Sequence, residues 1–154
     1  GTLDKFVGDE IMAFWGAPLD QPNHAELAVK CALNMSDRLD QLQDKWRAEG
    51  KYPLDNGIGI NTGPVLIGNI GSADKKMDYT AIGDHVNLGA RVETLTRKYD
   101  SRILFTEFTY EKIRRLVEEG VLYRVDMKEI DIVKVKGKDI PVKIFGIRAK
   151  PSSH

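Results

Sequence analysis

LDKFVGDEIMAFWG, residues 3–16, is the stretch that decides the fold. It holds two apolar runs of strand-like composition, separated by Gly8 and Asp9, and this arrangement predicts a β-hairpin with Asp9 at its tip. Lys5 lies four residues before that aspartate on the first strand. The hairpin would therefore hold a cation and a carboxylate near each other, which suits a site for a metal ion and a substrate group.

The composition is that of one soluble globular domain, with 42% hydrophobic and 30% charged residues among 154. The 23 basic and 23 acidic residues cancel, which argues against nucleic-acid binding and against direct contact with an anionic membrane. No apolar run approaches the roughly 20 residues of a membrane span. The single cysteine, Cys31, is expected to fill the core, and its lack of a partner favours a cytoplasmic location. A longer parent chain could still be tethered to a membrane.

A long helix is expected after the hairpin and a proline-containing loop. Asn23 and Glu26 have the spacing of a capping box, and the apolar period predicts a helix to about Arg47, with Gly50 ending it. The expected buried stripe consists of Leu27, Ala28, Cys31, Met35, Leu39, Leu42 and Trp46.

The rest of the chain alternates strands and helices. The patterns predict two short strands around a turn at 62–64, a strand at 78–82, a helix from 83 to about 99, a strand at 102–105, a helix at 106–119, strands at 122–125, 130–135 and 141–147, and a turn at 136–139. Residues 1–149 are expected to form one α+β domain with helices on one face of the sheet, followed by a disordered tail at 150–154.

Five polar residues stand out, although each has an ordinary structural explanation. Asp9 suits a tight turn, Lys5 and Lys136 suit solvated positions, and Asn87 and Arg91 are spaced as a surface pair on a helix. Together they offer a carboxylate for a divalent metal, cations and an amide, which a nucleoside triphosphate site requires. No G-x-x-x-x-G-K-[ST] phosphate loop is present, so side chains would have to hold the phosphates.

Four blocks of the sequence carry a family resemblance: KFVGDEIMAFWG at 5–16, GIGINTG at 57–63, YTAIGDHVNLGARVE at 79–93 and VKGK at 135–138. In this order, over almost the whole chain, they resemble the class III nucleotidyl cyclase catalytic domain. The resemblance implies a ferredoxin-like α+β fold with a mostly antiparallel sheet. It also implies that two divalent ions, Mg²⁺ or Mn²⁺, assist the attack of the nucleotide's 3′-hydroxyl on its own α-phosphate, which yields a cyclic nucleotide and pyrophosphate.

The resemblance assigns a role to each catalytic candidate. Asp9 matches the second of two metal-binding aspartates, and Asn87 matches the residue that positions the ribose. Arg91 would stabilise the charge that develops on the α-phosphate, because its planar donors match phosphate geometry. Lys136 matches the lysine that contacts the terminal phosphates.

Two positions assign the base in this family, and here they are Lys5 and Thr80. A lysine can donate to adenine N1, and a threonine hydroxyl can accept from the exocyclic amine of adenine. Guanylyl cyclases typically carry Glu and Cys instead. The resemblance therefore implies ATP as substrate, with a guanylyl cyclase as the nearest alternative and a non-catalytic regulatory or dimerisation module as the other.

The family also works as a head-to-tail dimer, so a chain with both sets of residues is expected to form a homodimer with two shared sites. One subunit would supply Lys5, Asp9 and Thr80, and the other Asn87, Arg91 and Lys136. The glycine-rich strands around Gly59 and Gly68 could allow a close approach at that interface, or they could mark ordinary bulges.

One part of the family pattern is not found in this sequence. The first metal-binding aspartate belongs to a strand motif, Phe-x-Asp-Ile-x-Gly-Phe-Thr, which lies well upstream of the second aspartate, whereas eight residues precede Asp9 here. Asp4 is no substitute, because it lies beside Lys5 inside the hairpin. The domain is therefore expected to be N-terminally truncated, without its first strand, the helices that follow it and one metal ligand, and to turn over little or no ATP alone.

Overall fold

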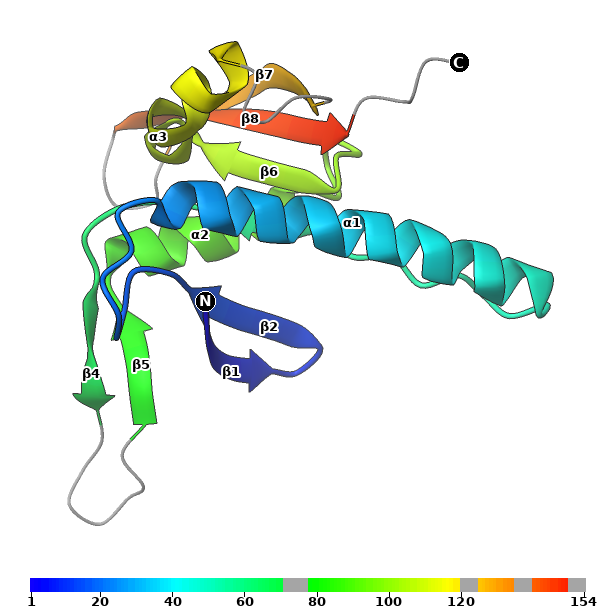
Figure 1. Cartoon of the computed structure of the whole chain (residues 1–154), viewed down its shortest axis with the longest axis horizontal. Helices are drawn as coiled ribbons and strands as arrows, with labels where there is room; N and C mark the ends of the chain where they lie inside the picture. The colour runs from blue at the N-terminus through cyan, green and yellow to red at the C-terminus, as the bar shows by residue number, and fades with distance from the viewer. Residues whose placement is uncertain (71–77, 120–124, 135–139, 150–154) are drawn as a thin grey trace.

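The computed structural model describes residues 1–70, 78–119, 125–134 and 140–149. Three sheets and three helices lie within these residues (Figure 1). In chain order the elements are β1 (Thr2–Val7), β2 (Glu10–Phe14), α1 (His24–Ala48), β3 (Ile58–Ile60), β4 (Leu66–Ile70), β5 (Asp78–Ile82), α2 (Asp84–Leu95), β6 (Ile103–Thr106), α3 (Glu107–Glu118), β7 (Val125–Lys134) and β8 (Pro141–Ala149).

The N-terminal hairpin forms as predicted. Strands β1 and β2 pair antiparallel around a two-residue turn, and Gly8 at the first turn position has a φ of +61°, which glycine adopts without steric cost. The register shifts within β1, because Leu3 pairs with Ala13 whereas Lys5 pairs with Met12. Asp4 is therefore the extra residue of a β-bulge.

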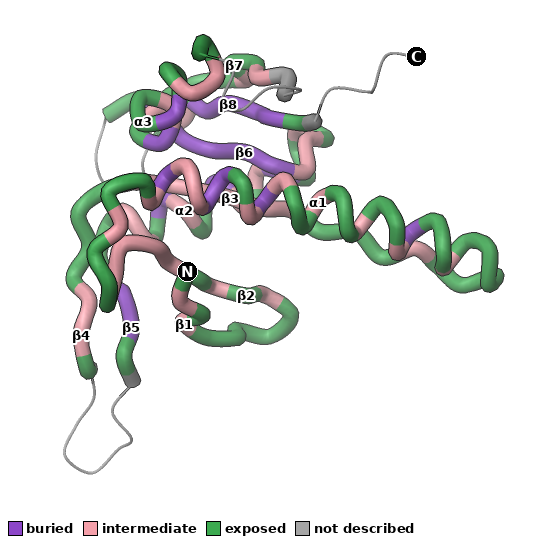
Figure 2. The backbone as a smooth tube through the Cα atoms, in the orientation of Figure 1, coloured by how far each residue is buried: buried purple, intermediate pink, exposed green. Residues whose placement is uncertain are grey.

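The core is a four-stranded sheet with the order β3-β6-β8-β7, in which β3 and β6 are parallel and the other neighbours are antiparallel. Ile103 and Phe105 of β6 pack with α1 and α3, whereas Leu104 packs with α2. The helices thus cover both faces of the sheet, and the expectation of helices on one face is wrong. All of β6 is buried, as its purple trace shows in Figure 2.

Helix α1 begins after Asn23, as predicted, but Asn23 makes no side-chain capping hydrogen bond. Its buried residues are Ala25, Ala28, Val29, Ala32 and Gln43. The predicted stripe is therefore rotated from the true one: Met35 is 43% exposed, and Cys31 is half-buried instead of filling the core. Small side chains allow α1 to lie close to the sheet, so the buried face follows the alanines instead of the largest apolar residues.

Other boundaries differ where tertiary contacts outweigh local pattern. Strands β3 and β4 do not pair with each other: β3 joins the main sheet, and β4 pairs antiparallel with β5 in a separate arm. Helix α2 ends at Leu95, not near Tyr99, and the Thr96 hydroxyl donates to the Glu93 carbonyl beyond this end. In α3, Thr109 is buried whereas Phe108 is 38% exposed. The expected turn at 136–139 and the tail at 150–154 lie outside the described residues.

Gly59 allows α2 to lie against β3. A Cβ atom at Gly59 would be 2.4 Å from the backbone nitrogen of Glu93 and 2.7 Å from the carbonyl oxygen of Gly89, whereas one at Gly68 would have no atom within 4 Å. The close approach at Gly59 is therefore made within this chain, to its own helix. No helix among the described residues is both long and apolar enough to span a membrane.

Candidate functional site

Helix α2 presents Asn87 and Arg91 on its outer face. Leu88 and Val92 on the inner face are buried against the sheet, so the residues one position before them are exposed. Within the described residues, the guanidinium of Arg91 has no ion pair with a carboxylate. The structure therefore leaves Asn87 and Arg91 available to a ligand, on a helix that is fixed from behind.

A partly buried polar network holds the beginning of α2. The Asn61 side-chain amide donates to the His85 carbonyl at 2.8 Å and lies 3.1 Å from His85 Nδ1, while the Thr106 hydroxyl donates to Asn61 Oδ1 at 2.6 Å. The backbone carbonyl of His85 can only accept a hydrogen bond, so the side-chain nitrogen of Asn61, which donates, must face His85. The same nitrogen lies beside His85 Nδ1, which therefore accepts as well. Asn61 thus ties the end of β3 to α2 and β6, a role that sequence pattern did not reveal.

The hairpin and the β4–β5 arm bring together the two residues expected to contact the base. Thr80 is 6% exposed, and its hydroxyl donates to Asp4 Oδ2 at 3.0 Å, across 76 positions of sequence. Lys5 follows Asp4 on β1 and is exposed. Phe14 of β2 and Tyr79 of β5 pack with their ring centroids 6.0 Å apart. Lys5 and Thr80 therefore lie on elements that contact each other, as is required of two residues that bind the same base.

Asp9 lies exposed at the tip of the hairpin, as predicted. Its carboxylate is the kind of oxygen donor that Mg²⁺ or Mn²⁺ prefers. In the part of the chain that the structure describes, no three His, Cys, Asp or Glu side chains gather as a possible metal site. Asp9 fits as one ligand, and the described residues do not complete a site for two ions. Lys136, the expected phosphate contact, lies outside the described residues.

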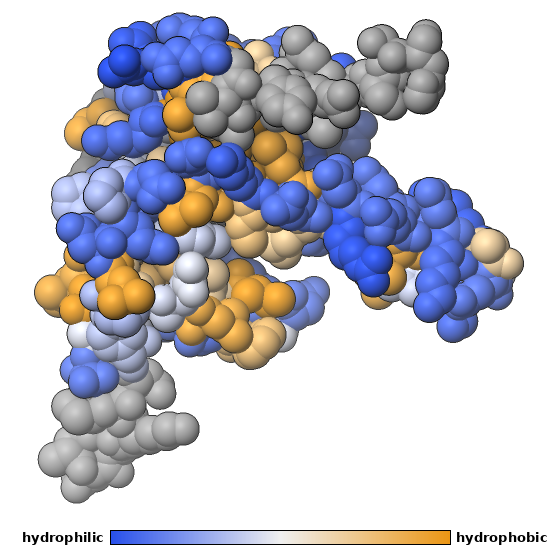
Figure 3. All heavy atoms as spheres, in the orientation of Figure 1, coloured by the Kyte–Doolittle hydropathy of each residue, from blue (hydrophilic) through white to orange (hydrophobic). Residues whose placement is uncertain are grey.

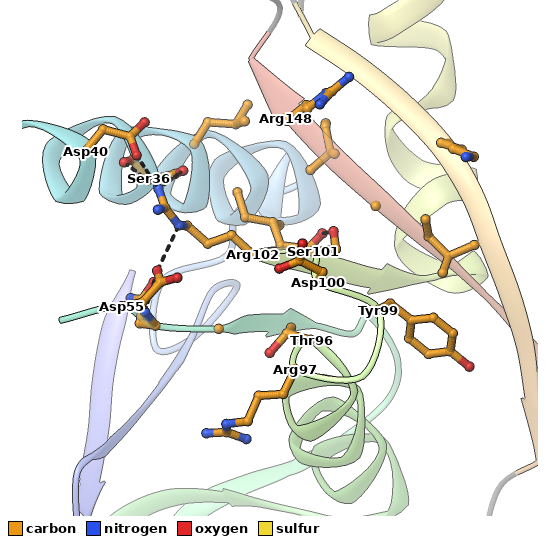
Figure 4. A pocket seen from close by; sticks show the side chains of 18 of the residues that line it. Ser36, Asp40, Asp55, Thr96, Arg97, Tyr99, Asp100, Ser101, Arg102 and Arg148 are labelled. Atoms are coloured by element: carbon orange, nitrogen blue, oxygen red, sulfur yellow. Dashed lines mark hydrogen bonds and ion pairs between the residues drawn. The ribbon is translucent and has the colours of Figure 1, made fainter. Parts of the chain in front are cut away.

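A pocket of about 790 Å³ lies between α1, the residues after α2 and strands β6 to β8 (Figure 4). Arg102 closes one side: it contacts Asp40 at 2.7 Å, Asp55 at 3.2 Å and the Ser36 hydroxyl at 3.0 Å. None of the predicted site residues lines this pocket. Arg102 thus connects α1 to the sheet, and no sequence motif predicts this role.

Tyr99, which also lines this pocket, donates a hydrogen bond to Asp131 of β7. The bond raises the pKa of the Tyr99 hydroxyl and lowers the pKa of the Asp131 carboxyl. The pair joins the segment after α2 to β7 of the main sheet.

Apolar side chains are exposed over the hairpin and the β4–β5 arm, where Figure 3 shows much of the orange surface. They include Leu3, Phe6, Ile11, Leu66 and Ile82, which are 43% to 67% exposed. A monomeric protein seldom leaves so many large apolar residues together in water. This side of the molecule therefore has the character of an interface, and it includes the strands that carry Lys5 and Thr80.

Comparisons with known proteins point to one family. Residues 5–148 match the family model described as the adenylate and guanylate cyclase catalytic domain. The terminal-differentiation-specific adenylate cyclase of Dictyostelium discoideum is 40% identical over 148 residues, which is 96% of this chain and 6% of that protein. An adenylate cyclase of Anabaena cylindrica is 35% identical over 153 residues, which is 97% of this chain and 28% of that protein. The chain thus spans less than a third of the length of these curated relatives.

Two solved structures have the same fold. The adenylyl cyclase CyaB of P. aeruginosa is 35% identical with a TM-score of 0.79, and the match covers 100% of this chain and 73% of that one. The guanylyl cyclase Cya2 is 34% identical with a TM-score of 0.78, and the coverage is again 100% and 73%. The ferredoxin-like α+β fold expected from the sequence is confirmed.

Proposed function

The chain belongs to the adenylate and guanylate cyclase catalytic domain family, and from this we propose that it is the catalytic part of an adenylyl cyclase, which converts ATP to 3′,5′-cyclic AMP and pyrophosphate. The observation that carries the choice of ATP is that Lys5 and Thr80 lie on two strands, β1 and β5, that contact each other. The hydrogen bond between Asp4 and Thr80 joins these strands. Lys5 can donate to adenine N1 and Thr80 can accept from the adenine amine.

Residues of α2 would act on the reacting phosphate. When the 3′-hydroxyl attacks the α-phosphorus and the bond to pyrophosphate breaks, negative charge builds up on the α-phosphate oxygens. The guanidinium of Arg91, exposed and without a carboxylate partner among the described residues, can direct two N–H donors at those oxygens. Asn87, one helical turn earlier, can hold the ribose so that the hydroxyl stays in line. Divalent ions would need ligands in addition to Asp9.

We further propose that two copies of the chain share each site. The exposed apolar side chains of the hairpin and the β4–β5 arm offer the surface for such a homodimer, and the strands beneath carry Lys5 and Thr80. In a two-fold pair the α2 face of the partner would complete the site with Asn87 and Arg91. We place this domain in the cytoplasm, where ATP is available.

A guanylyl cyclase is the second candidate, because the guanylyl cyclase Cya2 matches almost as closely as the adenylyl cyclase CyaB. The two candidate functions differ in the base that Lys5 and Thr80 would bind. A lysine opposite the protonated N1 of guanine would place two donors against each other, which costs binding free energy.

Product formation from each nucleotide tests the proposal. We expect the full-length protein with Mn²⁺ to form cyclic AMP from ATP with a kcat/KM at least about tenfold above that for cyclic GMP formation from GTP, as expected for one mismatched hydrogen bond. The 154-residue chain assayed alone should turn over far less. Chromatographic separation of the products measures both rates, and a preference for GTP would contradict the choice of substrate.

A further inference from the structure

We propose that Asp4 determines base specificity by fixing the direction of the Thr80 hydroxyl, so that Thr80 can only accept a hydrogen bond from the nucleotide base. The inference rests on the proposed function, in which Thr80 contacts the base. It adds to that proposal a residue, Asp4, that touches no substrate and acts through another side chain.

Strand β1 carries a bulge next to β5. In a regular strand, successive side chains point to opposite faces of the sheet. The extra residue in β1 is Asp4, since Leu3 and Lys5 pair with the adjacent residues Ala13 and Met12. A bulge of this kind redirects a side chain and is frequent beside functional sites. Here it accompanies the contact of Asp4 with β5, directly before the lysine expected to contact the base.

The Asp4 carboxylate is held by two donors from β5. Its Oδ2 atom accepts from the Thr80 hydroxyl at 3.0 Å and from the Ala81 backbone N–H at 3.3 Å. Asp4 is half-buried, and Thr80 and Ala81 are both buried. The backbone contact fixes the carboxylate independently of the hydroxyl, so the position of Asp4 does not depend on how Thr80 rotates.

The chemistry of these two groups sets the direction of the hydrogen bond. A hydroxyl has one proton and two lone pairs, whereas an ionised aspartate only accepts. The proton of Thr80 is therefore committed to Asp4, and the hydroxyl has only lone pairs to offer to a ligand. Because Thr80 is 6% exposed, water has little access to compete for this proton.

Adenine and guanine differ at the atom that such a hydroxyl would meet. Adenine carries an exocyclic amine at C6, which donates, whereas guanine carries a carbonyl oxygen there, which accepts. A Thr80 hydroxyl that can only accept forms a hydrogen bond with the amine of adenine, whereas it meets the carbonyl oxygen of guanine with a second acceptor. A free threonine hydroxyl would serve either base, because it could turn its proton to the carbonyl. Threonine alone thus gives no discrimination at C6, and Asp4 supplies it.

The test compares Asp4→Ala with Asp4→Asn in the full-length protein, by equilibrium binding of ATP and of GTP with Mn²⁺. Alanine removes the acceptor, so the ratio of the ATP to the GTP association constant should fall by roughly tenfold, the effect of one hydrogen bond. Asparagine loses the charge but can turn its Oδ1 to Thr80 and Ala81, so it should keep the ratio within about threefold of wild type.

Thr80→Val provides the second comparison, because valine neither donates nor accepts. The ratio should fall in this variant, and adding Asp4→Ala to it should change the ratio no further. A ratio that is unchanged in Asp4→Ala, that falls equally in Asp4→Asn, or that still responds to Asp4→Ala in the valine background would overturn the inference. A purely structural loss would weaken both nucleotides alike and leave the ratio unchanged.

Binding separates this inference from the proposed function. A protein that binds both nucleotides but makes no cyclic product would contradict the proposed function and leave the binding ratio as a valid test of Asp4. A wild-type preference for GTP would contradict the choice of ATP, and Asp4→Ala should then increase that preference. Failure to bind either nucleotide would overturn the inference.

Discussion

Replacing Arg91 with alanine is expected to lower the kcat for cyclic AMP formation by roughly 100- to 1,000-fold in the full-length protein, the loss measured when a transition-state donor is removed. The KM for ATP should change much less, because the charge that Arg91 would stabilise develops only as the bond to pyrophosphate breaks. Initial rates at several ATP concentrations, with cyclic AMP quantified by chromatography, give both constants.

Arg97→Ala is the matched control for this experiment. Arg97 follows the end of α2, is exposed and contacts Glu93 at 3.5 Å, so it shares the charge and the exposure of Arg91 but lines the pocket that Arg102 closes. Its kcat should stay within about twofold of wild type, and both variants should unfold within about 0.5 kcal/mol of wild type, as exposed positions usually do. Equal losses of kcat in the two variants would contradict the role of Arg91.

Replacing Gly59 with alanine is expected to lower the free energy of unfolding by about 2–3 kcal/mol, at the upper end of the range for overpacking. The added methyl group would be 2.4 Å from the backbone nitrogen of Glu93 and 2.7 Å from its Cα atom, and neither can move away as the end of a flexible side chain would. Helix α2 would have to shift away from β3, and with it Asn87 and Arg91. Chemical denaturation monitored by circular dichroism measures the loss.

Gly68→Ala is the control, because a Cβ at Gly68 has no atom within 4 Å and the position does not require a positive φ. Its unfolding free energy should stay within about 1 kcal/mol of wild type, the difference that glycine and alanine make in a strand. The same loss of stability in both variants would contradict the claim that the close contact between α2 and β3 requires glycine at position 59.

Much of the fold could be predicted from local pattern. Gly8 and Asp9 between two apolar runs specify a hairpin, and Asn23 together with Gly50 brackets the long helix correctly. Sequence pattern failed where packing chooses among several apolar residues: α1 buries its alanines, and Met35 is exposed. A long helix with apolar residues around most of its surface has no single face that periodicity can identify.

The sequence of β6 does indicate the layer arrangement. Ile103, Leu104 and Phe105 form a short continuous apolar run, and such a run is typical of a strand covered on both faces. The structure buries all four residues of β6. This run indicates helices on both sides of the sheet. The pairing of β4 with β5 instead of β3 had no such signal, because strand composition does not specify the partner.

The family blocks name the candidate site residues, and their roles stay predictions, whereas the residues that support them carry no such motif. The structure places Lys5 and Asp9, both exposed, in the hairpin, and Asn87 and Arg91, also exposed, on α2. The contact of Asp4 with Thr80 could not be foreseen, because it joins residues 76 positions apart and accompanies a bulge in β1. A bulge depends on the register of two strands, and alternation within one strand does not reveal it.

A mixing experiment with the full-length protein tests the central claim most directly, namely that two copies of this domain share an ATP-cyclising site. Asp9→Asn should remove the metal carboxylate from one half of each site, and Arg91→Ala should remove the phosphate contact from the other half. Each variant alone should make almost no cyclic AMP. An equimolar mixture should recover about a quarter of wild-type activity, because half the dimers are mixed and each has one intact site. A mixture no more active than its components would contradict the account.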